Sequence, residues 1–127
     1  RRRHTRYGTV TGVQTCALPI LRIGRRGDFK IGLNETAIGL PLPQIGLEFA
    51  RDRLNPLELQ AATIMAKLYN PDEAVSAGYL DRVTEGDVLI EAIEEAKRLA
   101  QLDAIAFAET KSRLRQPTID RVAILRR

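Results

Sequence analysis

The rest of the chain is arranged around residues 28–40, which read Asp28-Phe29-Lys30-Ile31-Gly32-Leu33-Asn34-Glu35-Thr36-Ala37-Ile38-Gly39-Leu40. In its first half Phe29, Ile31 and Leu33 alternate with a lysine and a glycine, and this period of two predicts a half-buried strand. A shorter strand is expected just before it, over residues 21–23. The two strands could form a hairpin or belong to separate rungs of a larger sheet, and the local pattern leaves both arrangements open.

One carboxylate, that of Glu35, stands among residues that favour burial. The simpler hypothesis is that Asn34 and Glu35 form a surface turn in which the carboxylate is solvated, and spacing alone favours it. The other hypothesis places Glu35 in an apolar pocket as a general acid or base. The residue pattern by itself does not decide between them.

Helix signals follow this stretch, once Pro41 and Pro43 have interrupted regular structure. Asn55 and Asn70 are strong helix starts, because each precedes a proline and stands three residues before a glutamate. Gly78 fits a left-handed C-cap, after which residues 79–83 should be extended. We therefore expect helices over residues 44–54, 55–69, 70–78, 84–102 and 103–115, with a last helical piece over residues 118–127.

The helical periods also predict which side chains are buried. Glu48, Arg51 and Asp52 fall on the outer face of the first helix and are expected to be solvated, whereas Met65 should fill core space. Pro117 should end the helix that precedes it. The longest helix should bury one apolar stripe, formed by Leu89, Ala92, Ile93, Ala96, Leu99 and Ala100.

The composition excludes several classes of protein. The chain has 127 residues, no tryptophan and only 5% aromatic residues, so its core should be aliphatic. A single cysteine and the lack of a Cys/His cluster exclude a disulfide framework and a zinc site. No apolar run is long enough to span a bilayer and no signal peptide is present, so we expect a cytoplasmic protein.

The positive charge is concentrated at one end of the chain. The net charge is +4, but residues 1–27 hold seven arginines and no acidic residue, whereas residues 28–127 carry 13 basic and 16 acidic residues. Residues 10–20 read like the translation, in one frame, of a widely used DNA-sequencing adaptor, so we interpret residues 1–20 as an artefactual or disordered leader. Neither His4 nor Cys16, which fall in it, is a candidate site residue. The alternative is a small helical interaction module with a basic arm that binds nucleic acid.

Two motifs carry a family resemblance. Residues 29–39 closely resemble the enoyl-CoA hydratase/isomerase, or crotonase, family. Residues 71–83, which read PDEAVSAGYLDRV, resemble the helix, glycine and strand of the same family. The two motifs occur in the family's order, and the resemblance covers about residues 22–115.

The resemblance implies an α/β fold and a C-terminal fragment of a longer enzyme. Residues 21–83 would be the end of a β-β-α spiral core, of which only the last strands are present, and residues 84–127 a mainly α-helical C-terminal region used for trimer contacts. The enzyme would act on acyl-CoA thioesters in fatty acid metabolism, as a homotrimer or a dimer of trimers. It would need no cofactor, since coenzyme A is part of the substrate, and no metal, nucleic acid or membrane.

The resemblance also assigns the site. Glu35 matches the glutamate that moves a proton through an enolate intermediate, whose charge two backbone amides stabilise. In a hydratase a second glutamate would activate water, whereas in an isomerase Glu35 would shuttle the proton alone. Gly39, Leu42 and Pro43 are the expected substrate-binding residues. Nothing in this sequence matches the family's second glutamate or its glycine-rich oxyanion loops, and prolines replace a glycine-rich tract of many hydratases, which bears against hydration.

Overall fold

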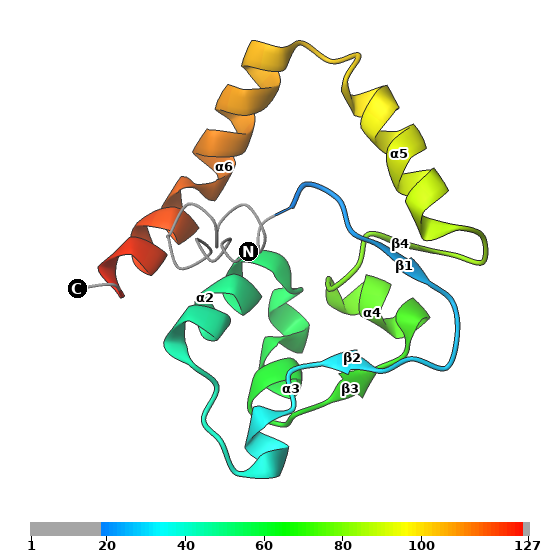
Figure 1. Ribbon diagram of the computed structural model, residues 1–127. Helices are drawn as coiled ribbons and strands as arrows, with labels where there is room; N and C mark the ends of the chain where they lie inside the picture. The colour runs from blue at the N-terminus through cyan, green and yellow to red at the C-terminus, as the bar shows by residue number, and fades with distance from the viewer. Residues whose placement is uncertain (1–18, 126–127) are drawn as a thin grey trace, which may run out of the picture.

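The computed structural model describes residues 19–125 of the chain, so most of the predicted leader, with His4 and Cys16, lies outside the described residues. Short strands and helices form one body, from which the two longest helices rise as an inverted V (Figure 1). The fold is mixed α/β, as predicted. In chain order its elements are β1 (Ile23–Arg25), β2 (Ile31–Gly32), the 3-10 helix η2 (Glu35–Ile38), α2 (Gln44–Arg53), the 3-10 helix η3 (Pro56–Glu58), α3 (Leu59–Thr63), β3 (Leu68–Tyr69), α4 (Pro71–Ala77), β4 (Arg82–Thr84), α5 (Val88–Leu99) and α6 (Ala104–Ile124).

The two leading strands do not form a hairpin. β1 pairs in parallel with β4, with Ile23 opposite Arg82, whereas β2 pairs antiparallel with β3, with Ile31 opposite Tyr69. Each strand therefore belongs to a separate two-stranded sheet, and its partner comes from much later in the chain. β2 is shorter than predicted, and Phe29 lies before it with half of its surface exposed.

The core lies where α2, α3, α4 and the β2–β3 pair meet. Its buried residues are mostly small or aliphatic, as the composition predicts, with one tyrosine: Ala50, Leu54, Ala62, Tyr69, Ala74 and Ala77. Ile31 and Leu33 pack against this cluster from the β2 segment. The β2 segment thus contributes one wall of the core.

The signals around α4 are confirmed. The Asn70 side chain accepts from the Glu73 backbone N–H at 2.8 Å, and the Glu73 carboxylate accepts from the Asn70 N–H at 3.0 Å, which completes a capping box. Gly78 closes the helix in the left-handed region with a φ of 101°. These three positions, Asn70, Glu73 and Gly78, fix a seven-residue helix that would be marginal alone.

The helix predicted over residues 55–69 is wrong in its second half. Asn55 does cap a 3-10 turn, but α3 ends at Thr63, Ala66 has a positive φ of 53°, and the chain then enters β3. Met65 is 72% exposed and does not fill the core. Pairing of Tyr69 with Ile31 overrides the helical period, because it buries the tyrosine ring completely.

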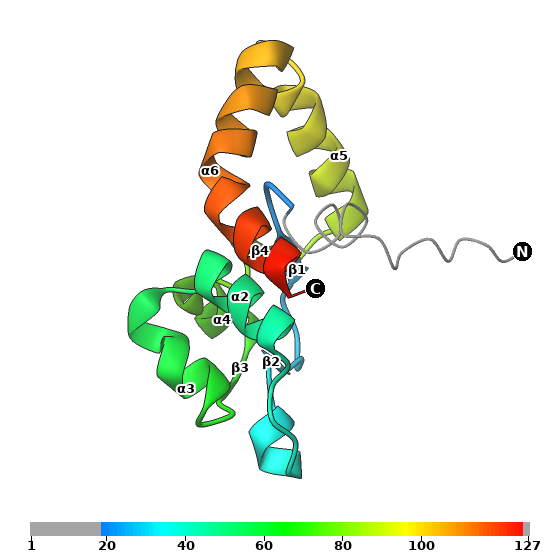
Figure 2. The same ribbon diagram turned by 90° about the vertical axis from the view of Figure 1, so that its left-hand side faces the viewer.

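The long helices differ from expectation in two ways. α6 continues through Pro117, and the apolar stripe of α5 is largely exposed, with Leu89 at 67% and Ile93 at 46%. The two helices diverge in both views, so neither covers the other along its length (Figures 1 and 2). Among residues 19–125 no helix is long and apolar enough to cross a membrane.

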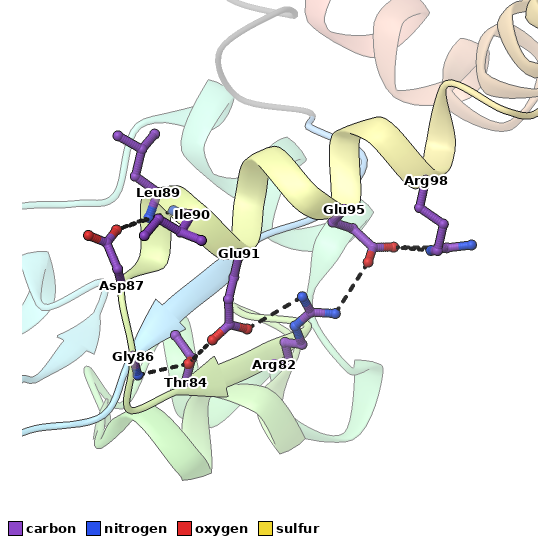
Figure 3. Close-up of polar contacts among 9 residues, drawn as sticks. All are labelled: Arg82, Thr84, Gly86, Asp87, Leu89, Ile90, Glu91, Glu95 and Arg98. Atoms are coloured by element: carbon purple, nitrogen blue, oxygen red, sulfur yellow. Dashed lines mark hydrogen bonds and ion pairs between the residues drawn. The ribbon is translucent and has the colours of Figure 1, made fainter.

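Polar contacts fix the base of α5 on β4 (Figure 3). Asp87 caps the helix by accepting from the backbone N–H groups of Leu89 and Ile90, at 2.8 and 3.2 Å. Arg82 of β4 lies 3.5 Å from carboxylate oxygens of both Glu91 and Glu95. One arginine and two carboxylates one turn apart therefore link α5 to β4, although several apolar side chains of α5, among them Leu89, Ile90 and Ile93, remain exposed.

Gly78 offers a stability test. A Cβ at this position would lie 2.8 Å from the Arg53 carbonyl oxygen and 3.0 Å from the Asn55 nitrogen, in a left-handed conformation. Gly78→Ala should therefore lower the free energy of unfolding by about 2 kcal/mol, through backbone strain and overpacking. Gly39→Ala is the matched control, because Gly39 is also left-handed but has open space around it, and should cost about 1 kcal/mol. Equal losses in urea unfolding would show that the α2–α4 contact is not tight.

Candidate functional site

The site begins at η2, the 3-10 helix that opens with Glu35. The Gly39 and Leu40 backbone N–H groups donate back to the Thr36 and Glu35 carbonyls, at 3.3 and 2.9 Å, and close the turn. The Thr36 hydroxyl donates to the Ile64 carbonyl at 2.9 Å, which ties η2 to the end of α3. In both ribbon views this turn, coloured cyan, lies at the end of the molecule opposite the α5–α6 loop (Figures 1 and 2).

The Glu35 carboxylate is not simply solvated. The residue is half-buried, its Oε1 atom is shielded from solvent, and no group in the described part of the chain hydrogen-bonds to that atom. An unpaired buried carboxylate oxygen is costly and calls for an explanation. The hypothesis of a fully solvated carboxylate therefore does not describe this oxygen, and the catalytic role of Glu35 stays a prediction.

Tyr79 presents a second unpaired oxygen. Its hydroxyl is buried and has no hydrogen-bond partner among residues 19–125, and burial, followed by the charge of Glu35, raises the pKa of Tyr79. Tyr69, whose ring centroid lies 5.5 Å away, is different, because its hydroxyl donates to Glu58 at 2.9 Å. Glu35 and Tyr79 are thus electrostatic neighbours with unused hydrogen-bonding capacity.

A mainly apolar pocket of about 360 Å³ opens beside Tyr79. Its walls come from the β2 segment, α2 and the chain after α4, and are formed by Arg22, Ile31, Leu33, Gly46, Phe49, Ala50, Arg53, Leu54 and Tyr79. Apolar walls with a few polar groups are typical of ligand pockets. Glu35 does not line this pocket itself, but Leu33, two residues before it, and Tyr79 do.

Arg22 and Arg53 lie at the rim of the pocket, and both contact Asp81. The Asp81 carboxylate accepts from the Arg22 backbone N–H at 2.7 Å and lies 2.8 Å from Nη2 of Arg53. Burial, and next the positive charge of Arg53, lower the pKa of the Arg22 guanidinium. Asp81 therefore holds the backbone of Arg22 and the guanidinium of Arg53 at the rim of the pocket.

None of the three predicted substrate-binding residues, Gly39, Leu42 and Pro43, forms part of the wall of this pocket. Gly39 is exposed with open space around it, and Pro43 precedes α2 and is exposed. Leu42 is half-buried and packs against Gly46, where an added Cβ would lie 3.3 Å from its Cδ1 atom. Leu42 thus reaches the pocket wall through Gly46, whereas the structure brings neither Gly39 nor Pro43 to it.

Sequence reasoning missed Tyr79, Phe49 and Arg53. Tyr79 could have been singled out, because it directly follows the Gly78 cap inside the second motif. Phe49 and Arg53 carry no such signal, since their position depends on how α2 packs. Within residues 19–125 no group of three or more His, Cys, Asp or Glu side chains could hold a metal ion.

No family model matches this chain, and no curated protein matches its sequence. Solved structures do match. An enoyl-CoA hydratase/isomerase family protein from Pseudomonas syringae is 34% identical with a TM-score of 0.78, over 86% of this chain and 48% of that one. The probable enoyl-CoA hydratase EchA3 of Mycobacterium tuberculosis is 31% identical with a TM-score of 0.76, over 82% and 44% of the two chains. Human mitochondrial delta3-delta2-enoyl-CoA isomerase is 26% identical with a TM-score of 0.76, over 84% and 42%. The chain thus spans less than half the length of each of these proteins.

Proposed function

The chain has the fold of the enoyl-CoA hydratase/isomerase family, and we propose that the enzyme of which it is a C-terminal part acts on acyl-CoA thioesters. The reaction is hydration or double-bond isomerisation of an enoyl-CoA, and it passes through an enolate. Glu35 moves the proton at the carbon chain. The similarity in sequence and fold to hydratases and an isomerase supports the reaction class.

One observation carries the role of Glu35. Its Oε1 atom is shielded from water and has no hydrogen-bond partner in the described part of the chain, although backbone N–H groups of Ala37, Gly39 and Leu40 close the turn. A general base must keep a lone pair free for the substrate proton, and ion pairs or hydrogen bonds to a carboxylate reduce both that freedom and its basicity. Glu48 and Asp52, both engaged by α6 side chains, lack that freedom.

The apolar pocket beside Tyr79 would receive an aliphatic part of the acyl group, with Gly39, Leu42 and Pro43 along the approach. Leu42 supports this role through its contact with Gly46. Hydration and isomerisation differ by a second acid that activates water, and no residue of this chain matches it. Since Pro41 and Pro43 lack backbone N–H groups, the segment after Gly39 is poor in donors that could orient a water molecule.

The chain as given should have no hydratase or isomerase activity. Enolate charge requires backbone donors in an oxyanion hole, and the glycine-rich loops that the resemblance assigns to this role have no match here. We expect the purified chain to convert crotonyl-CoA or a 3-enoyl-CoA no faster than buffer, in an absorbance assay of the thioester. Turnover by this polypeptide that disappears in Glu35→Gln would overturn the proposal that the site is incomplete.

We further place the enzyme in the cytoplasm, in fatty acid metabolism, as a homotrimer or a dimer of trimers. The exposed apolar side chains of α5, among them Leu89, Ile90 and Ile93, support an assembly that covers them. The alternative of a nucleic-acid-binding arm has less support. Arg26, one of the seven arginines counted for that arm, is bound at 2.7 Å to Asp72 and at 3.0 Å to Glu85.

A further inference from the structure

The apolar pocket of about 360 Å³ beside Tyr79 contains two cations. Arg22 and Arg53 belong to its wall, whereas the described residues that form this wall include no aspartate or glutamate. Charges among apolar groups are screened less than charges in water, so the two guanidinium groups favour an anion over a neutral molecule. The aliphatic part of the wall, which includes Ile31 and Leu33, favours a ligand that also has a hydrocarbon chain.

Arg53 keeps hydrogen-bonding capacity beyond its ion pair. Its Nη2 atom lies 2.8 Å from Asp81, but neither Nη2 nor Nε makes a hydrogen bond within residues 19–125. Buried donors without an acceptor cost free energy, and a guanidinium can bind a carboxylate through two parallel N–H groups. The side chain of Arg53 is 22% exposed and lines the pocket, so a ligand can reach part of it.

The acids around the two arginines do not balance their charge. Asp81 accepts from the Arg22 backbone N–H and pairs with Arg53, so one carboxylate serves both residues. Asp52, the next acid in this region, is bound by Arg115 at 2.8 Å. Three arginines therefore face two aspartates. In keeping with this excess, burial and then the charge of Arg53 lower the pKa of Arg22, although the two aspartates oppose that shift.

We propose that this pocket binds an aliphatic carboxylate, with its charged end at Arg22 and Arg53 and its chain on the apolar wall. The charge of Glu35 acts on Tyr79, so the anion belongs beside the arginines and the chain toward Tyr79. Two ligands share this chemistry: a free short-chain fatty acid, and the acyl group of a thioester that ends in a second carboxylate. The second is a substrate class, and its relevance rests on the proposed function.

Binding of hexanoate to the isotope-labelled full chain, followed by NMR, tests this. The Gly46 amide and the methyl groups of Ile31 and Leu33 belong to the wall, and their signals should shift to saturation. Hexan-1-ol lacks the charge and acetate lacks the chain, so each should bind about tenfold more weakly or less. The absence of saturable shifts at this wall, or equal affinities for hexanoate and hexan-1-ol, overturns the proposal.

A variant of Arg53 tests the charged end of the site. Arg53→Met should weaken hexanoate binding about tenfold, because charge-assisted hydrogen bonds are lost, and should change hexan-1-ol binding little. Arg51→Met is the matched control, since Arg51 lies on the same helix, is 54% exposed and is not part of the pocket wall. Unchanged hexanoate affinity in Arg53→Met, or equal losses in both variants, overturns the proposal. If Arg53→Met does not fold, the comparison of ligands on the unaltered chain still decides.

Two thioesters of equal chain length distinguish the sources of the carboxylate. Adipoyl-CoA ends in a carboxylate and hexanoyl-CoA does not. Displacement of hexanoate by adipoyl-CoA alone assigns the pocket to the acyl group, and displacement by neither assigns it to a free acid. Equal displacement by both contradicts a site for carboxylates. None of these measurements depends on turnover, so their failure is distinguishable from the failure of Glu35 as the acid/base, which only activity reports.

Discussion

Glu35→Gln in the full-length enzyme should lower kcat for an enoyl-CoA by about 10²- to 10⁴-fold, the usual contribution of a positioned acid or base. Glutamine keeps the shape of the side chain but cannot take up the substrate proton. KM should change little, because the pocket wall is formed by other residues. Steady-state kinetics with the unaltered and variant enzymes, prepared alike, measure both constants.

The control for this variant is Glu94→Gln. Glu94 is an exposed glutamate on α5, so its replacement makes the same chemical change away from η2 and should leave kcat unaltered. The free energy of unfolding of Glu35→Gln in urea should equal that of the unaltered enzyme or be slightly higher, because a buried unpaired charge is removed. A full rate in Glu35→Gln would exclude Glu35 from the mechanism.

The sequence predicted the structural features that depend only on neighbouring residues. The capping box of Asn70 and Glu73, the left-handed Gly78 and the bounds of α2 were all readable in the sequence, because each depends on residues within one or two turns. Strand partners were not readable. β1 and β2 look like neighbours in the sequence, but their pairing partners lie more than 35 positions away, which no short pattern encodes.

The residues of the candidate site also differ in how far the sequence could predict them. Glu35 came from a resemblance, since its spacing alone favoured a solvated turn, and its proposed role remains a prediction. Tyr79, Phe49 and Arg53 line the pocket only because α2 and the chain after α4 pack side by side, and that packing is tertiary. Their residue types are ordinary for a core or a helix face, so nothing marked them as part of a site.

The face of α2 that carries Glu48 and Asp52 is buried, contrary to the prediction from the sequence. Glu48 and Asp52 were expected in solvent, but their side chains are only 8% and 7% exposed, because α6 lies across them. Arg121 binds Glu48 at 3.2 Å, and Arg115 binds Asp52 at 2.8 Å. The same contacts explain why α6 continues through Pro117. They fix the helix on both sides of the proline and offset the backbone hydrogen bond that proline, which has no N–H, cannot donate.

Arg115→Met should therefore lower the free energy of unfolding by about 3 kcal/mol, because it leaves the buried Asp52 carboxylate without its cation. The Thr118 hydroxyl, at 2.6 Å, would still donate to this carboxylate. Methionine keeps most of the aliphatic contact of the arginine stem, so the loss reports the charge rather than packing. Urea unfolding followed by circular dichroism measures it.

Arg113→Met is the matched control, because Arg113 stands two residues before Arg115 on the same helix, α6. Arg113 is 82% exposed and pairs with Glu109 at 3.3 Å on the same helix, so its loss should cost less than about 0.5 kcal/mol. The double variant Asp52→Asn with Arg115→Met should recover part of the stability lost by Arg115→Met alone, because the stranded charge is gone. If Arg115→Met and Arg113→Met cost the same, the α2–α6 contact is not held by buried charge, and another interaction must carry α6 through Pro117.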